Sequence, residues 1–331
     1  MLVLGVETSC DETSAGVVRN GREILSNVIL SQEIHTKYGG VVPELASRIH
    51  ITELVDIIDS ALDRAGVVLK DLDGMAVTCG PGLVGCLLVG LSFVKAVYQS
   101  TGIPYLGVNH LEGHIFSNLL EHERLQTPHI TLVASGGHSN LYYVEDWGKY
   151  KLLGSTRDDA PGEAFDKIAK LLGLGYPGGP AIEKRSAGGK KDFIDFPRAM
   201  REKDNYEFSF SGLKTAVAIY LKDKSPEFIS EHLSDIAASF QEAVCEILAI
   251  KTINAAEVYN VSQVSITGGV ARNGRLREIL EERKPSGLEV FFPSPELCSD
   301  NGAMIAACGS FHLSRGEKSD LGLNAVPYLE L

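Results

Sequence analysis

The chain of 331 residues is long enough for two domains of ordinary size, and its 44% hydrophobic content and mean hydropathy of +0.03 exclude a disordered protein. A formal net charge of −12 argues against a nucleic-acid-binding protein that acts through bulk electrostatics, but does not exclude a local basic patch. The 34 glycines, many in clusters after apolar runs, are typical of an α/β protein that binds ligands with backbone loops.

The cysteines and the N-terminal residues predict a cytoplasmic protein. None of the six cysteines forms a C-x-x-C pair, so we expect reduced thiols that mostly fill the core. Residues 1–7 lack a basic start and reach an acid after six residues, which predicts a buried strand rather than a signal peptide. No apolar run approaches the ~18–20 residues of a membrane span, and we expect no membrane association.

The first half of the chain predicts a strand hairpin followed by alternating helices and strands. Asn20-Gly21 is a strong type I′ turn signal between two strands, and 80–85 indicates a tight turn that needs no ligand. In chain order we expect strands at 2–6, 14–19 and 23–31, a helix at 43–66, a strand at 74–78, a helix at 83–100, a strand at 103–108 and a helix that begins at His110.

The second half repeats this order, which indicates an internal duplication. We expect strands at 129–134, 139–145 and 150–155, a helix at 162–173, a long helix at 226–258, a strand at 263–267, a helix at 273–282, a strand at 288–292 and a last helix that begins near 299–302. The predicted domains are an N-terminal lobe at 1–125 and a C-terminal lobe at 126–302, with an insertion at about 176–225. The segment at about 303–331 is expected to pack back on the first lobe.

His110 and His114 are four residues apart and therefore lie on one helix face, about 6 Å apart at Cβ. This is the spacing of two imidazole ligands on one metal ion, although a capping histidine beside a surface histidine would give the same pattern. In the duplicated pattern Asp300 begins the corresponding element, so we expect it to complete the site from the opposite lobe. Ser299-Asp300 is also a good helix N-cap. Two histidines and a carboxylate suit non-haem iron, and zinc also accepts them.

Three glycine loops and one acidic loop are further candidate sites. The loop 135–138 is either an anion nest or a plain tight hairpin, and 267–274 is a strand-to-helix loop where a nucleotide usually binds. The third loop, 176–180, could be only a turn. Asp166 in an early helical turn could bind a ribose or simply favour the helix dipole. The loop 7–13 holds three acids, which repel one another unless a cation or a proton lies among them.

The insertion at 184–203 is locally basic, with seven basic residues against three acidic ones. It is a candidate for contact with a phosphate backbone, or a solvated charged loop. The basic residues are Lys184, Arg185, Lys190, Lys191, Arg198, Arg201 and Lys203, and the acidic ones are Asp192, Asp195 and Glu202.

From end to end, and in order, the chain resembles the bacterial form of the TsaD family, the tRNA threonylcarbamoyladenosine synthase component. The motifs that carry the resemblance are LGVETSCDETS (4–14), YGGVVPELASRIH (38–50), GPGLVGCLLVG (80–90), NHLEGHI (109–115), SGGH (135–138), GEAFDKIAKLLGLGYPGGP (162–180), FSFSGLKT (208–215), TGGVARN (267–273) and SDNGAMIA (299–306). The resemblance implies the actin-like ATPase fold of sugar kinases and heat-shock chaperones, with two duplicated RNase H-like lobes around a central cleft.

The resemblance also implies site residues and ligands. His110, His114 and Asp300 would bind one Fe²⁺ per subunit, with Zn²⁺ as the alternative. Asp11 and Glu12 would have active-site roles. The adenylate or an ATP-type nucleotide, with or without Mg²⁺, would be held by Val133, Ala134, Ser135, Gly136, Gly137, Asp166, Gly179, Glu183 and Asn273.

The implied reaction transfers a threonylcarbamoyl group from threonylcarbamoyl-adenylate to N6 of adenosine 37, in tRNAs that read codons beginning with A, and releases AMP. The implied partners are tRNA and the proteins TsaB and TsaE, with TsaC supplying the adenylate. Kinases of this fold usually carry Asp where this chain has Glu7, so ordinary phosphoryl transfer is not expected to be the main chemistry.

Three alternatives remain from the residues. One is a carbohydrate or acetate-type kinase of the same fold, and another is a scaffold that needs partners. The third is a metallopeptidase, for which the fit is poor. Glu112 stands two residues after His110, on another helical face than the Glu of an H-E-x-x-H motif.

Overall fold

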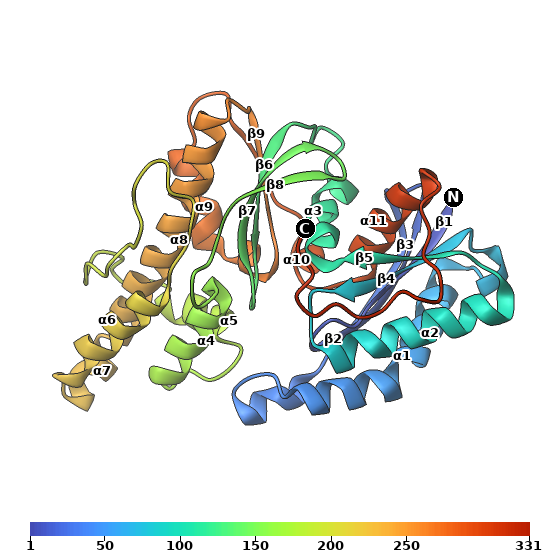
Figure 1. Cartoon of the computed structure of the whole chain (residues 1–331). Helices are drawn as coiled ribbons and strands as arrows, with labels where there is room; N and C mark the ends of the chain where they lie inside the picture. Colours follow the sequence, from blue (N-terminus) through green and yellow to red (C-terminus); the bar gives the residue numbers. More distant parts are fainter. The chain divides into compact units, whose positions relative to one another are not determined.

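The computed structural model describes all residues, 1–331, and contains two compact units (Figure 1). Unit 1 comprises Met1–Arg124 and Pro293–Leu331, and unit 2 comprises Leu125–Phe292. The chain thus returns to unit 1 at Pro293, earlier than the predicted lobe end at 302. Asp300 therefore belongs to the same unit as the two histidines, and the prediction that it comes from the opposite lobe is wrong.

Unit 1 is built on a five-stranded sheet of order β3-β2-β1-β4-β5, in which β1, β4 and β5 are parallel and β2 and β3 antiparallel to their neighbours. The strands are β1 (Leu2–Glu7), β2 (Glu12–Arg19), β3 (Glu23–Ser31), β4 (Gly74–Gly80) and β5 (Tyr105–Asn109). The helices are α1 (Pro43–Ala65), α2 (Val84–Thr101), α3 (His110–Glu121), α10 (Pro295–Cys298) and α11 (Gly302–Ser314), with short 3-10 turns at Glu33–Tyr38 and Leu69–Asp71.

Strand alternation decides which residues of β1 face which helices. Leu4 and Val6 belong to the apolar core that also contains buried residues of α1 and α2. The alternate position Gly5 faces α11 instead, because a Cβ there would lie 2.1 Å from the carbonyl oxygen of Gly302. Glu7 has the same parity as Gly5. The last residue of this buried strand is therefore directed to the α11 side of the sheet.

Unit 2 repeats the topology of unit 1 with a sheet of order β10-β9-β6-β7-β8. As in unit 1, three strands are parallel and the hairpin strands antiparallel, which confirms the predicted duplication. The strands are β6 (His129–Ala134), β7 (Ser139–Asp146), β8 (Lys149–Ser155), β9 (Gln263–Thr267) and β10 (Glu289–Phe291). The helices are α4 (Pro161–Leu171), α5 (Gly178–Ser186), α6 (Ser211–Lys222), α7 (Pro226–Glu231), α8 (Leu233–Val258) and α9 (Gly274–Arg283), with a 3-10 turn, η3, at Gly269–Arg272.

The insertion region differs from the sequence prediction in two ways. Helices α5 and α6 were not expected, and the predicted helix at 226–258 is divided at His232 into α7 and α8. The imidazole of His232 stacks on Phe193 from the insertion, with ring centroids 4.8 Å apart, and also bonds Asp235. These tertiary contacts stabilise the interruption between α7 and α8, which the hydrophobic periodicity of the sequence does not reveal.

One helix, α2, is long and apolar enough to cross a membrane by length and composition alone. Its Leu87, Leu91 and Val94 are buried in unit 1, and Leu91 and Val94 join the main core cluster. Helix α2 therefore packs as a core helix of unit 1 on this face, while its opposite face stays exposed.

Candidate metal centre and nucleotide loops

The two histidines are presented by the abrupt start of α3. Strand β5 ends at Asn109 and α3 begins at the next residue, because the Asn109 side chain accepts hydrogen bonds from the backbone N–H groups of Leu111 and Glu112. One helical turn then separates His110 from His114, and both side chains are buried. The strand-to-helix junction thus aims both imidazoles in one direction.

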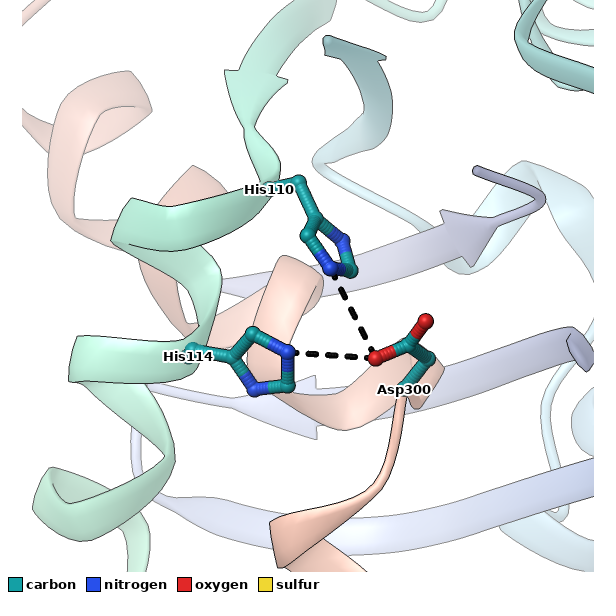
Figure 2. A group of neighbouring side chains, drawn as sticks. All are labelled: His110, His114 and Asp300. Carbon is teal, nitrogen blue, oxygen red and sulfur yellow. Dashed lines mark ion pairs between the residues drawn. The ribbon is translucent and has the colours of Figure 1, made fainter. Parts of the chain in front are cut away.

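Asp300 meets both histidines at a single oxygen atom (Figure 2). Its Oδ1 lies 3.5 Å from Nε2 of His110 and 3.1 Å from Nε2 of His114. The two imidazole rings stand edge to face with centroids 4.7 Å apart, and the three ligand atoms lie within 4.8 Å of one another. The structure therefore brings together the three residues expected from the sequence.

Asp300 is delivered by the short connection between α10 and α11. The cap of α11 is Asn301, whose side chain accepts the backbone N–H of Met304, so Asp300 is not the N-cap that the sequence also allowed. The first turn of α11 is held on the sheet of unit 1, because the N–H of Gly302 donates to Oγ of Ser14. This docking places Asp300 beside α3.

Glu7 supports the orientation of His110 in which Nε2 is turned toward Asp300. Its Oε2 lies 3.0 Å from Nδ1 of His110, which directs Nε2 of the same ring toward Asp300. Burial alone would lower the pKa of His110, but the carboxylates of Asp300 and Glu7 raise it to about 9. Burial conversely raises the pKa of Glu7, yet the neighbouring His110 keeps it below its usual value. Sequence reasoning missed this supporting role, although a Glu that ends a buried strand is a usable signal.

The other two acids of the 7–13 loop lie near the same centre. Glu12 begins β2, so it is a strand residue rather than the loop residue that was expected. Burial raises the pKa of Glu12 well above its usual range, and the charges of Asp300 and Asp11 raise it further. The two glutamates therefore differ in protonation. Glu7 stays ionised beside an imidazole, whereas Glu12 favours the protonated form. This agrees with the expectation that a cation or a proton lies among these acids.

The donor set fits one divalent transition-metal ion. Two imidazole nitrogens and one carboxylate oxygen converge on one point, and three such ligands suit Fe²⁺ or Zn²⁺ while leaving coordination positions for a substrate. A carboxylate behind a metal-facing histidine, as Glu7 is behind His110, is a common second layer of such centres.

The two glycine-rich loops of unit 2 share one edge of its sheet. Strands β6 and β9 are parallel neighbours with Val133 opposite Thr267, so the segments 134–138 and 268–273 follow the same sheet edge. The N-terminus of α4 lies against the first loop, where a Cβ at Gly162 would lie 2.7 Å from the carbonyl oxygen of Ser135. Gly136 and Gly137 face open space, which is what a close ligand approach requires.

The remaining predicted adenylate residues surround this edge but have structural bonds of their own. Oδ1 of Asp166 accepts the N–H of Gly178 at 2.7 Å and so ties α4 to the start of α5. Glu183 Oε1 accepts the N–H of Gly274 at 2.7 Å. Asn273 caps α9, and its Nδ2 donates to Gln241. Gly179 faces open space. Gln241 is a buried supporting residue that no sequence motif indicated.

The two five-stranded units have the α/β architecture of the actin-like ATPase fold, as expected. HypF from T. kodakarensis has a TM-score of 0.65 at 16% identity, and covers 95% of this chain and 48% of its own. Component A of the Acidaminococcus fermentans (R)-2-hydroxyglutaryl-CoA dehydratase has a TM-score of 0.57 at 15% identity, and covers 95% of this chain and 99% of its own. At this identity the likeness shows the fold alone.

Sequence comparison identifies the family. The profile of TsaD, tRNA N6-adenosine threonylcarbamoyltransferase, matches residues 23–307. The enzyme of that name from Clostridioides difficile (strain 630) is 50% identical over 100% of this chain and 98% of its own length. The one from Syntrophotalea carbinolica is 52% identical over 98% of this chain and 95% of its own length. The chain belongs to the TsaD family.

Proposed function

We propose that this protein transfers the threonylcarbamoyl group of threonylcarbamoyl-adenylate to N6 of adenosine 37 in tRNAs that read codons beginning with A, and releases AMP. The observation that carries the proposal is full-length similarity to threonylcarbamoyltransferases, combined with the cluster of His110, His114 and Asp300 in unit 1. The leaving group of the acyl-adenylate is already activated, so the protein has mainly to position and polarise the reactants.

His110, His114 and Asp300 are the proposed metal ligands, with one Fe²⁺ per subunit and Zn²⁺ as the alternative. When bound, the ion supplies Lewis acidity to an oxygen of the acyl donor. The chain's own contribution is to hold His110 in the tautomer that presents Nε2, which Glu7 does through Nδ1. Asp11 and Glu12, beside this centre, are proposed active-site residues, because the carboxyl group of Glu12 interacts with the charges of both Asp300 and Asp11.

The glycine loops of unit 2 are the proposed adenylate site. Val133, Ala134 and Ser135 lead into Gly136 and Gly137, whose missing side chains leave room beside the backbone N–H groups for an anionic ligand. The proposed set also includes Asp166, Gly179, Glu183 and Asn273. Asp166 links α4 to the start of α5, and Glu183 and Asn273 bond the turn into α9. A nucleotide there could carry Mg²⁺ on its phosphate.

A partner protein of the TsaB type is proposed to bind the exposed face of α1 and α2. The two helices pack against each other so closely that a Cβ at Gly85 would lie 3.3 Å from Cβ of Ser47. Beside this crossing, four apolar side chains are 43–65% exposed: Ile51, Val55, Val84 and Leu88. Neighbouring apolar side chains on a surface favour a protein interface. TsaE and the adenylate-forming TsaC are further proposed partners, and the proposed location is the cytoplasm.

The tRNA is proposed to bind through local contacts, because the net charge of −12 repels a polyanion. The basic insertion is a weaker candidate surface than the sequence suggested. Arg198 pairs with Glu246, Lys203 with Glu257 and Lys191 with Glu278. These carboxylates offset much of the local positive charge. The target base lies in a single-stranded loop, where it can be splayed out without breaking a duplex.

The comparisons favour this transferase over the kinase and metallopeptidase readings. The threonylcarbamoyltransferases match this chain along almost their whole length. The kinase hypothesis is supported only by the shared fold. The peptidase reading also lacks a base, because Oε1 of Glu112 lies 3.0 Å from Nε2 of His312, a residue of α11 outside the His110–His114–Asp300 group.

The direct test supplies threonylcarbamoyl-adenylate and unmodified tRNA to the metal-loaded chain, with and without TsaB and TsaE, and measures the modified nucleoside by mass spectrometry. We expect modification of wild-type tRNA and none when guanosine replaces adenosine 37. The double variant His110→Ala/His114→Ala should lose the metal ion held by His110, His114 and Asp300, and transfer with it. Full activity in a metal-free double variant would refute the proposed metal role, and sugar-dependent ATP turnover would favour the kinase.

A further inference from the structure

A second group of metal-ligating side chains lies in unit 1, between α3 and α11. Cys308 and His312 are one helical turn apart on α11, and Glu112 faces them from α3. The sulfur, an imidazole nitrogen and a carboxylate oxygen of these residues lie within 4.8 Å of one another, with Oε1 of Glu112 3.0 Å from Nε2 of His312. None of the three belongs to the His110–His114–Asp300 group.

The cluster is buried on one side and reaches solvent on the other. Cys308 is fully buried and Glu112 is 7% exposed, whereas the side chain of His312 is 17% exposed. The two helices approach closely here because α3 has glycine at position 113, where a Cβ would lie 2.6 Å from Cδ1 of Ile305. The close helix packing is what allows side chains from both helices to converge.

A carboxylate behind the imidazole fixes the direction of the ring. Oε2 of Glu317 lies 3.0 Å from Nδ1 of His312, so Nε2 is turned inward to Glu112. The relation of Glu317 to His312 repeats that of Glu7 to His110 at the first centre. Carboxylate–histidine pairs of this kind orient the ligating nitrogen in metal sites.

We propose that Glu112, Cys308 and His312 bind a Zn²⁺ ion that joins α3 to α11. A thiolate, an imidazole nitrogen and a carboxylate oxygen are all ligands of zinc, and the thiolate distinguishes this site from one for Mg²⁺ or Ca²⁺. Ligand distances of about 2.0–2.3 Å require only a small contraction of the cluster. The proton of the Cys308 thiol leaves to solvent on binding, and water takes the fourth position on the side of His312.

The site would hold together the two elements that carry the first metal centre. Helix α3 supplies His110 and His114, and α11 begins two residues after Asp300. A cross-link between these helices would restrict the separation of the three residues. The proposal stands on the cluster alone and does not depend on the transferase activity.

Cobalt substitution tests the proposal, because only a thiolate ligand gives Co²⁺ a strong near-ultraviolet charge-transfer band. We expect the purified full-length chain to show this band on titration with Co²⁺, and Zn²⁺ to abolish it. Cys308→Ser should remove the band. The matched variant Cys10→Ser should retain it, although Cys10 lies in the acidic loop near Asp300.

A second variant keeps the test decisive if Cys308→Ser does not fold. His312→Gln changes a partly exposed side chain and should weaken Co²⁺ binding at this site by on the order of tenfold or more. The double variant His110→Ala/His114→Ala should keep the thiolate band. Absence of the band in the wild-type chain, or a band that survives Cys308→Ser, would overturn the proposal and leave His312 as an ion-pair partner of two carboxylates.

Discussion

Glu7 and His110 form a buried carboxylate–imidazole pair, with Oε2 of Glu7 3.0 Å from Nδ1 of His110. The hydroxyl of Thr78 donates to the same carboxylate oxygen at 2.6 Å, and the N–H of Ser9 donates to the other oxygen at 2.5 Å. Thr78 lies on the neighbouring strand β4, and Ser9 lies in the loop two residues after Glu7. The pair therefore fixes the ring of His110 before any metal arrives.

Glu7→Gln should weaken metal binding without unfolding the protein. The amide keeps the size of the side chain but removes the charge that supports Nδ1 of His110, which typically costs 10- to 100-fold, roughly, in metal affinity. Chelator competition measures the dissociation constant. Glu44→Gln, at an exposed carboxylate of the same unit, is the matched control and should leave the constant unchanged. Equal affinities in the two variants would exclude the orienting role of Glu7.

Gly137→Ala should fold normally but bind the adenylate poorly. A Cβ at Gly137 meets no atom within 4 Å, so the protein tolerates it, whereas a ligand on that surface would not. Gly212→Ala in α6 also faces open space and serves as the control. Isothermal titration with the adenylate and thermal unfolding separate the two effects. Unchanged affinity in Gly137→Ala would move the ligand away from this loop.

Gly162→Ala should instead destabilise unit 2. The new Cβ would lie 2.7 Å from the carbonyl oxygen of Ser135 and 2.8 Å from Cα of Gly136, and backbone atoms cannot yield as a flexible side chain can. Overpacking of this kind costs about 1–3 kcal/mol. Denaturant unfolding of the variant measures the loss. A stability equal to that of the wild-type chain would show that α4 shifts freely against the loop.

His129 should make unit 2 sensitive to acid. This histidine is fully buried at the start of β6, and burial lowers its pKa to about 4 although Nδ1 bonds the carbonyl of Gln126. As the pH falls, the unfolded chain therefore takes up a proton on His129 before the folded chain does. The contribution of neutral, buried His129 to stability is complete above about pH 6.5 and is lost as the pH falls toward 4. Between pH 7 and pH 5 the expected loss is roughly 2 kcal/mol.

The variant His129→Asn tests this assignment because an amide N–H can replace the bond to Gln126 without titrating. Its loss of stability between pH 7 and pH 5 should be smaller than that of the wild-type chain. The only tryptophan, Trp147, lies 5.6 Å from His129 between ring centroids, so its fluorescence follows the unfolding of this region. Parallel pH profiles for the two proteins would assign the acid sensitivity elsewhere.

Leu88→Glu should abolish binding of the proposed TsaB-type partner while leaving the fold intact. Leu88 is 43% exposed on α2, so the charge stays solvated in the free protein but would be buried in a complex. The exposed Ile219 in α6 of unit 2 provides the matched control, Ile219→Glu, on a different surface. Analytical ultracentrifugation with purified TsaB measures the complex. Binding that tolerates Leu88→Glu would place the partner on another face.

The order of strands and the duplicated topology could be predicted because hydrophobic periodicity and turn residues act locally. The Asn20-Gly21 turn is a clear case, with both residues at positive φ as a type I′ turn requires. The histidine pair was equally accessible, since its four-residue spacing on a helix is a property of the sequence alone.

The unit that carries Asp300 could not be predicted from such local signals. Helix α11 packs against the sheet of unit 1 because Gly5 and Gly16 have no side chain where the backbone of Gly302 approaches. This contact joins residues almost 300 positions apart in the sequence. Helices α5 and α6 were missed for the same reason, as their packing rather than their periodicity stabilises them. Glu7 was recognised only as a departure from the kinase pattern, and its bond to His110 became visible in the structure.

The path of the chain has a consequence for how the protein is made. Unit 2 is inserted between two pieces of unit 1, since the chain leaves at Arg124 and returns at Pro293. On the ribosome, both histidines emerge early, but the third member of their cluster follows only after the whole second unit has been synthesised. A nascent chain therefore cannot assemble this centre until residue 300 has been synthesised, and a chain that stops before residue 300 would contain the whole second unit but lack this centre.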